Sequence, residues 1–116
     1  MSFHPDADAG TVATARVANE LFEERVRQQI AEPWTPAHDD EYRQGQLENA
    51  ALTYLQYGRD DHRFADAQRH QAAGTSPPSW PWASRWWKPS SRRRMLVKAG
   101  ALVIAAIERL DREAGE

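Results

Sequence analysis

The chain has 116 residues, a formal net charge of −2 and no cysteine. This length corresponds to a single domain, and the lack of cysteine excludes disulfides and thiolate catalysis. No apolar run reaches the ~20 residues of a membrane-spanning helix, and the first residues lack the basic and apolar regions of a signal peptide. We therefore expect one soluble cytoplasmic domain that does not bind membranes.

The charge is distributed unevenly along the chain. No acidic residue lies between Asp66 and Glu108, and that interval carries seven basic residues, which leaves −9 for the remainder of a chain with net charge −2. A basic patch on an otherwise acidic protein directs anions to one place. The alternative is that these basic side chains pair with the acidic helices of their own fold, and the sequence leaves both interpretations open.

The sequence predicts an all-α fold, a compact bundle built from three main helices. Residues 1–10 are rich in aspartate and contain proline and glycine, so we expect a disordered tail there, followed by a single helical domain over 11–116. Apolar residues recur at intervals of three or four in three segments of this domain, which is the spacing of a helix with one buried face. The predicted helices span about 11–31, 39–57 and 91–112.

Two glycines lie inside these predicted helices. Gly45 falls within the pattern of the second helix, where glycine costs about 1 kcal/mol relative to alanine, so we expect a close helix crossing or a ligand there. Gly100 lies between two alanines, which leaves a smooth patch for the close approach of another helix. Residues 102–107 are apolar almost all round, so the third helix should be central and the most buried.

Two further segments connect the second and third helices. Residues 59–74 are polar, and their pattern allows a short helix over 61–72 with Phe64 as its one large apolar anchor. Residues 75–91 form a long loop rich in tryptophan and proline. Loops of this length are usually functional or disordered, and the tryptophans favour an ordered loop.

The tryptophan loop and the arginines that follow it form the first candidate site. Stacking of a base on an aromatic ring is worth about 1–3 kcal/mol, arginine binds phosphate through two parallel hydrogen bonds, and a helix N-terminus favours anions. A nucleotide-like or phosphorylated ligand would then bind Trp80, Trp82, Arg85, Trp86, Trp87, Lys88, Arg92, Arg93 and Arg94. The alternative is structural, with the tryptophans covering the helices as a lid and the arginines facing solvent. In either case we expect at least two of the four tryptophans in the core.

An acidic set forms the second candidate site. Glutamates three and four residues apart share a helix face, and paired carboxylates bind Mg²⁺ or Mn²⁺. The candidate ligands are Glu20, Glu23, Glu24, His38, Asp39 and Asp40. The alternatives are a solvated helix face with ion pairs for the glutamates and a capped helix start for the second group. No set for nucleophilic catalysis and no phosphate-binding glycine loop is present, so we predict no catalytic residue.

Several motifs resemble those of a group of small proteins from tailed phages and prophages. They are Trp34-Thr35-Pro36-x-His38-Asp39-Asp40, Gly45-x-Leu47, Ala50-Ala51, Pro77-Pro78-x-Trp80-Pro81-Trp82, Trp86-Trp87-Lys88-Pro89 and Leu96-Val97-Lys98-Ala99-Gly100-Ala101-Leu102. The resemblance covers nearly the whole chain and implies a phage protein that acts in the cytoplasm of an infected bacterium. A weaker likeness is to MazG-like all-α nucleotide pyrophosphohydrolases, although Glu23-Glu24 is not followed by an acid where their metal motif requires one.

Three functions follow from these patterns. The leading hypothesis is a phage protein that captures a nucleotide-like or phosphorylated ligand, without a cofactor, to counter host defence signalling. The second is an inhibitor or adaptor that binds a host protein through the tryptophan loop. The third is a metal-dependent nucleotide pyrophosphohydrolase that uses Mg²⁺ or Mn²⁺. Because a chain of this size buries only about two thirds of its unfolded surface, we also expect a homo-oligomer.

Overall fold

The computed structural model describes residues 5–31 and 45–115, with side chains from residue 8 onward. Within these ranges every regular element is a helix and no strand occurs, so the predicted all-α fold is confirmed. The elements are α1 (Pro5–Ala31), α3 (Gln46–Gly58), α4 (Asp61–Ala72), a short 3₁₀ helix η1 (Ser84–Trp86) and α5 (Arg92–Glu113). None of these helices combines the length and the apolar composition that a bilayer span requires.

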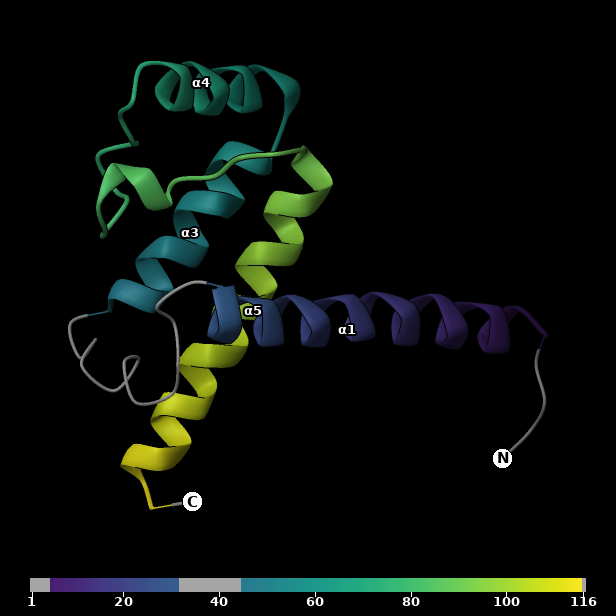
Figure 1. Ribbon diagram of the computed structural model, residues 1–116. Coiled ribbons are helices and arrows are strands. Elements are labelled where there is room, and N and C mark those ends of the chain that lie inside the picture. Colours follow the sequence, from purple (N-terminus) through teal and green to yellow (C-terminus); the bar gives the residue numbers. More distant parts are fainter. Residues whose placement is uncertain (1–4, 32–44, 116) are drawn as a thin grey trace.

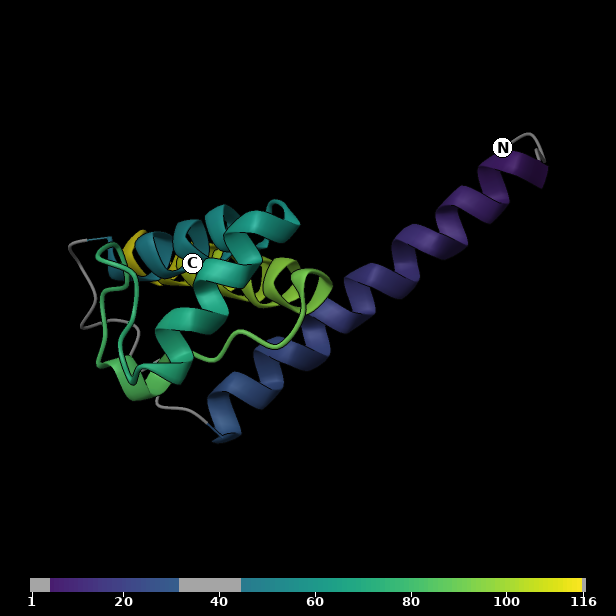
Figure 2. The same ribbon diagram turned by 90° about the horizontal axis from the view of Figure 1, so that it is seen from above.

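Helix α5 is the central element of the fold (Figure 1). Helix α3 packs along it in the antiparallel direction, because the end of α3 at Gly58 lies against the start of α5 at Arg92 and Met95. Helix α4 packs on α3, and α1 crosses α5. The N-terminal half of α1 leaves the bundle and extends away from it (Figure 2). The radius of gyration is accordingly 15.9 Å, against about 13 Å for a compact chain of this length.

Helix α1 begins at Pro5 rather than at Thr11, so residues 5–10, which were expected in a disordered tail, are helical. Proline suits the first turn of a helix because its missing N–H would have no partner there and its φ is already helical. Alanines at several of the following positions favour the helix further. Residues 1–4 of the expected tail lie outside the described residues.

The prediction that Gly45 lies inside the second helix is wrong. Gly45 has φ 81° and directly precedes α3, which begins at Gln46. A left-handed residue of this kind interrupts an α-helix, and glycine adopts it without steric cost. The helix predicted over 39–57 is therefore described as 46–58, and residues 39–44 lie outside the described residues.

The short helix predicted over 61–72 is present as α4. The side chain of Asp60 caps it by accepting a hydrogen bond of 2.7 Å from the backbone N–H of Arg63, and this bond is the main cause that lowers the pKa of Asp60. Ala67 is fully buried, and Phe64 packs against the core. Helix α4 therefore covers one end of the bundle with a small apolar face.

The tryptophan loop is ordered and two of its tryptophans are part of the core. Trp87 stacks on Tyr54 of α3 with ring centroids 5.1 Å apart and an interplanar angle of 18°. Trp80 meets both rings edge-on, at 5.2 Å from Tyr54 and 5.1 Å from Trp87. The indole N–H of Trp87 also donates to the carbonyl of Ala67, at 3.2 Å, which ties the loop to α4. The prediction that at least two tryptophans are core residues is confirmed.

Gly100 is the point where α1 crosses α5, as its neighbouring alanines predicted. A Cβ atom built on Gly100 would lie 2.6 Å from Cδ2 of Leu21, closer than two carbon atoms approach in proteins. Even alanine at this position would displace Leu21. The absence of a side chain at Gly100 thus leaves room for Leu21 at the crossing.

The prediction that α5 is buried all round between 102 and 107 is only half correct. Leu102, Ala105 and Ala106 are buried, but Val103 is 44% and Ile107 is 52% exposed. The apolar face of α5 is wider than the part of it that α3 and α1 together cover. A strip of apolar side chains on α5 is therefore left on the surface.

Replacement of Trp87 should show that the loop is part of the core. We expect Trp87→Ala to lower the free energy of unfolding by about 3–5 kcal/mol, the range for deletion of a large buried aromatic side chain. Trp86→Ala is the matched control, since Trp86 is half-buried, and it should cost clearly less. Chemical denaturation measures both values, and equal stability of the two variants would contradict a structural role for Trp87.

Candidate binding surfaces

The four tryptophans of the loop divide into two buried and two half-buried side chains. Trp80 and Trp87 are enclosed by Tyr54 and by each other, so a ligand cannot stack on them without opening the core. Trp82 and Trp86 are half-buried and lie at the edge of this cluster. Trp82 meets Trp80 edge-on at 5.4 Å. Of the predicted stacking residues, these two reach the surface.

Trp86 carries two basic side chains on its ring. The guanidinium carbon of Arg85 lies 5.3 Å from the ring centroid, and Nζ of Lys88 lies 5.1 Å from it. Both distances are within the range of cation–π attraction, worth about 0.5–1 kcal/mol at an exposed site. Three residues of the predicted nucleotide site are thus together on one part of the loop.

The three consecutive arginines do not join this group. Arg92 donates to the carbonyls of Gly58 at 3.2 Å and Arg59 at 2.7 Å, and its third contact is Asp61 at 3.3 Å. These carbonyls belong to the C-terminal end of α3, where a helix has unpaired acceptors and favours positive charge. Arg92 therefore caps α3.

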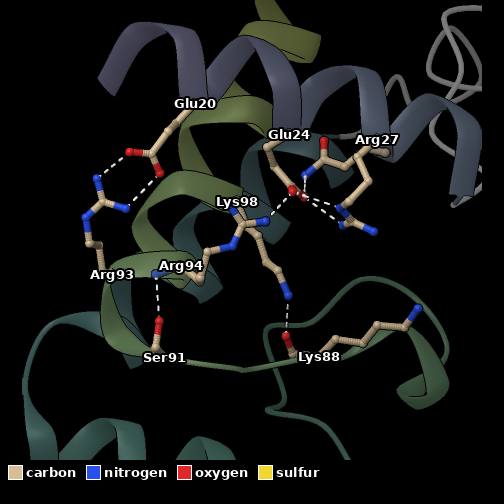
Figure 3. A network of polar contacts seen from close by, with 9 residues as sticks. Glu20, Glu24, Arg27, Lys88, Ser91, Arg93, Arg94 and Lys98 are labelled. Carbon is tan, nitrogen blue, oxygen red and sulfur yellow. Dashed lines mark hydrogen bonds and ion pairs between the residues drawn. The ribbon is translucent and has the colours of Figure 1, made fainter. Parts of the chain in front are cut away.

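Arg93 and Arg94 point to α1 instead (Figure 3). Arg93 holds Glu20 through two hydrogen bonds of 2.7 and 2.5 Å, and Arg94 donates to Glu24 at 2.5 Å. The hydrogen bond from Arg93 is the main cause that lowers the pKa of Glu20. Of the two interpretations of the basic interval, pairing within the fold is the one that describes these arginines.

Glu24 is the centre of the α1–α5 contact. Its side chain is almost fully buried, and besides Arg94 it accepts hydrogen bonds from Arg27 at 2.8 and 2.7 Å and from Gln28 at 3.2 Å. Burial by itself raises the pKa of Glu24, but the hydrogen bonds and charges of Arg27 and Arg94 outweigh it and lower the pKa below its ordinary value. Each carboxylate oxygen thus accepts two hydrogen bonds, which fills its lone pairs.

The predicted acidic metal site is not assembled within residues 5–31 and 45–115. Glu20 and Glu24 are each held by arginine, and Glu23 accepts a hydrogen bond of 2.9 Å from Asn19. No group of three histidine, aspartate or glutamate side chains in these ranges is placed to hold a metal ion. His38, Asp39 and Asp40 lie outside the described residues.

Lys98 is a further polar residue whose position the sequence did not reveal. It is buried, its Nζ donates to the carbonyl of Lys88 at 2.5 Å, and the same atom lies 5.7 Å from the ring of Tyr54. Lys98 thus holds the end of the tryptophan loop against the aromatic core. A lysine with this environment stabilises the loop from inside.

A groove between α3 and α5 is the surface that sequence reasoning missed. It has a volume of about 450 Å³ and is lined by residues 48–55 of α3 and residues 103–110 of α5. Its walls carry large apolar side chains that are all exposed, and its base is formed by two alanines. The apolar lining consists of Ala51, Leu52, Leu55, Val103, Ala106, Ile107 and Leu110. The signal in the sequence was the width of the apolar face of α5, which exceeds what one neighbouring helix can cover.

Comparison of the chain with protein-family models, with curated proteins and with solved structures gave no match.

The pH dependence of stability should depend on Glu24. Its folded-state pKa lies below the ordinary value of 4.5, so its contribution is fully present above pH 4.5 and is lost as the pH falls through the folded-state pKa. We expect Glu24→Gln to lower the free energy of unfolding at pH 7 by about 1–3 kcal/mol, because charged hydrogen bonds are lost.

The difference between Glu24→Gln and the unmodified protein should shrink as the pH falls below 4.5, as follows from this linkage. Urea denaturation at a series of pH values measures it. Asp111→Asn is the control, since Asp111 is exposed near the end of α5 and its replacement should change stability little across the series. A constant difference across the series would show that the charge of Glu24 does not contribute.

Proposed function

We propose that this chain is a binding protein whose ligand is another protein, docked as an amphipathic helix in the groove between α3 and α5. The observation that carries the proposal is the gathering of Leu52, Leu55, Val103, Ile107 and Leu110 around one cavity while each remains exposed. Contiguous apolar surface of this kind on a soluble domain marks sites of protein interaction.

The shape of the groove favours a helix as its ligand. Two antiparallel helices form its walls, and the alanines at its base, Ala51 and Ala106, allow a third helix to approach closely. A helix laid between them completes a three-helix arrangement by packing its side chains into the grooves of both neighbours. Such a ligand would present apolar anchors spaced three, four and seven residues apart, with a basic residue near Glu48.

The partner that we propose is a bacterial host protein or another phage protein, which follows the resemblance of the motifs to small phage proteins. The action would then be that of an inhibitor or adaptor, in which binding itself is the activity. The second hypothesis from the sequence placed the bound protein on the tryptophan loop. Here the docking surface is the α3–α5 groove, and the tryptophan loop stabilises the fold.

A second candidate is a nucleotide-like or phosphorylated ligand on the tryptophan loop. The observation that favours it is the pair of basic side chains, Arg85 and Lys88, on the ring of half-buried Trp86. A planar anion could exchange places with one of them on the ring while the other holds its phosphate. The site is smaller than the predicted one because Arg92, Arg93 and Arg94 have partners in the fold.

The groove can be tested by photo-crosslinking. We expect p-benzoylphenylalanine in place of Leu52 or Leu110 to form a discrete adduct with one protein in a bacterial host, and a synthetic peptide of the crosslinked segment to bind as a helix. Leu55→Asp and Ile107→Asp should each raise the Kd of that peptide at least tenfold, because each removes about 1.5–3 kcal/mol of apolar burial.

Gln56→Asp is the matched control for these variants, since Gln56 is an exposed neighbour of Leu55 outside the groove lining. It should leave the Kd unchanged. Circular dichroism verifies that all three variants fold. Adducts confined to the chain itself, or equal affinity of the groove variants and the control, would overturn the proposal.

The second candidate predicts a thermal shift with nucleotides. At a ligand concentration 100 times its Kd, binding adds about 2.7 kcal/mol, which raises the Tm of a domain of this size by several degrees. We expect such a rise with one member of a panel of mono-, di- and cyclic nucleotides, without Mn²⁺, and its loss in a variant that combines Arg85→Ala with Lys88→Ala. Arg63→Ala is the control, because the side chain of Arg63 is exposed on α4. No shift with any nucleotide would exclude this candidate.

A further inference from the structure

Helix α1 has two opposite faces that both carry apolar residues. The inner face packs on α5 through Leu21, Glu24 and Gln28. The outer face points the other way, since its residues lie roughly half a turn from these on a helix with 3.6 residues per turn. It is exposed along its whole length and consists of Val12, Ala15, Asn19, Phe22, Val26 and Ile30. We call this set the α1 seam.

The spacing of the α1 seam is that of a helix that pairs with another helix. From Val12 to Val26 its residues follow one another at intervals of three, four, three and four, which is a heptad pattern with Val12, Asn19 and Val26 at the first core position. Ala15 and Phe22 occupy the second core position. Asn19 is the polar member of this core and lies at a first core position.

Exposure of the apolar side chains of the α1 seam to water is unfavourable for an isolated chain. Phe22 is 63% and Ile30 is 81% exposed, and the N-terminal half of α1 extends beyond the bundle without another described element beside it (Figure 2). The accessible surface of the chain is 7167 Å², whereas a compact protein of this mass exposes about 6400 Å².

We propose that the α1 seam binds the α1 seam of a second copy, with the two helices antiparallel, so that the protein is a homodimer. This surface is separate from the α3–α5 groove, and no residue of the seam lines the groove. The dimer therefore presents two grooves.

Charge complementarity selects the register of this pair. In an antiparallel pair the first core positions of one helix lie beside the second core positions of the other. The residues that directly follow the second core positions then face the equivalent residues of the other helix. Arg16 and Glu23 both occupy this flanking position, and both are exposed. When Phe22 lies beside Asn19 of the second copy, Arg16 of each copy faces Glu23 of the other.

The neighbouring arrangements lack this complementarity. A shift by one heptad in one direction brings Arg16 to Arg16, and a shift in the other direction brings Glu23 to Glu23, which is repulsive. A parallel pair places Glu23 opposite Ala18 and gives no pair of opposite charges. The favoured register also lays residues 12–15 of each copy on residues 26–29 of the other, so each protruding half of α1 gains a neighbour.

Engineered disulfides test the orientation without background, because the chain has no cysteine. In the proposed register Ala15 lies beside Val26 of the second copy, whereas identical residues are about 16 Å apart along the axis, too far for a disulfide. We expect a mixture of the Ala15→Cys and Val26→Cys variants to form a mixed disulfide dimer on oxidation, and neither variant alone to crosslink. Crosslinking of each variant with itself would show a parallel pair and overturn the proposal.

Solution mass and charge reversal test the interface itself. Light scattering should give twice the chain mass of 13.2 kDa for the unmodified protein and the single mass for Phe22→Arg. Arg16→Glu or Glu23→Arg alone should raise the dimer Kd about tenfold, since two pairs become repulsive, and the variant with both changes should return to within about threefold of the original. A monomeric unmodified protein, or no rescue in the double variant, would overturn the proposal.

Leu55→Asp is the control that separates the two surfaces. It lies in the groove and should leave the dimer intact, while Phe22→Arg should leave binding of a groove peptide intact. A dimer that forms while the groove binds no peptide would contradict the proposed function alone. The opposite result would contradict the homodimer alone.

Discussion

The stack of Trp87 on Tyr54 is the contact on which the arrangement of the other elements depends. It joins the tryptophan loop to α3, and the hydrogen bond from the Trp87 indole to Ala67 joins both to α4. Lys98 then holds the end of the same loop from α5. Because the loop is fixed at these points, it delivers Ser91 as the cap of α5 and sets the direction in which α5 begins. A loop with this role in the core has little aromatic surface left for a ligand.

The start of α5 explains why three adjacent arginines do not form one anion site. Successive residues of a helix point about 100° apart, so Arg92, Arg93 and Arg94 reach three different partners. These are the C-terminal end of α3, Glu20 and Glu24. Two of the seven basic residues of that interval, Arg93 and Arg94, thereby pair with glutamates of α1, and the same contacts lie where α1 crosses α5. The charge asymmetry of the chain is thus an element of the fold.

Periodicity predicted the helices well, and local chemistry predicted some of their contacts. The helix over 61–72 and the close crossing at Gly100 both follow from residue type and spacing. The left-handed φ of Gly45 does not follow, because glycine tolerates both sides of φ space and the pattern is the same in either case. Periodicity identifies apolar residues but cannot say how many neighbours will cover them. For that reason the exposed strip on α5 and the outer face of α1 were visible only in the structure.

The two uncovered apolar surfaces differ in shape, and the difference decides what each can bind. The α3–α5 groove is concave, with alanines at its base and large side chains on its walls, a shape that suits the helical ligand proposed for it. The α1 seam is the convex edge of one helix, with Phe22 as its most prominent core residue. A convex apolar edge is covered most economically by an identical edge turned in the opposite direction, since each copy then supplies the charge that the other lacks. In the proposed arrangement the same chain would bind itself through α1 and a different protein through α3 and α5, because no residue of the seam lines the groove.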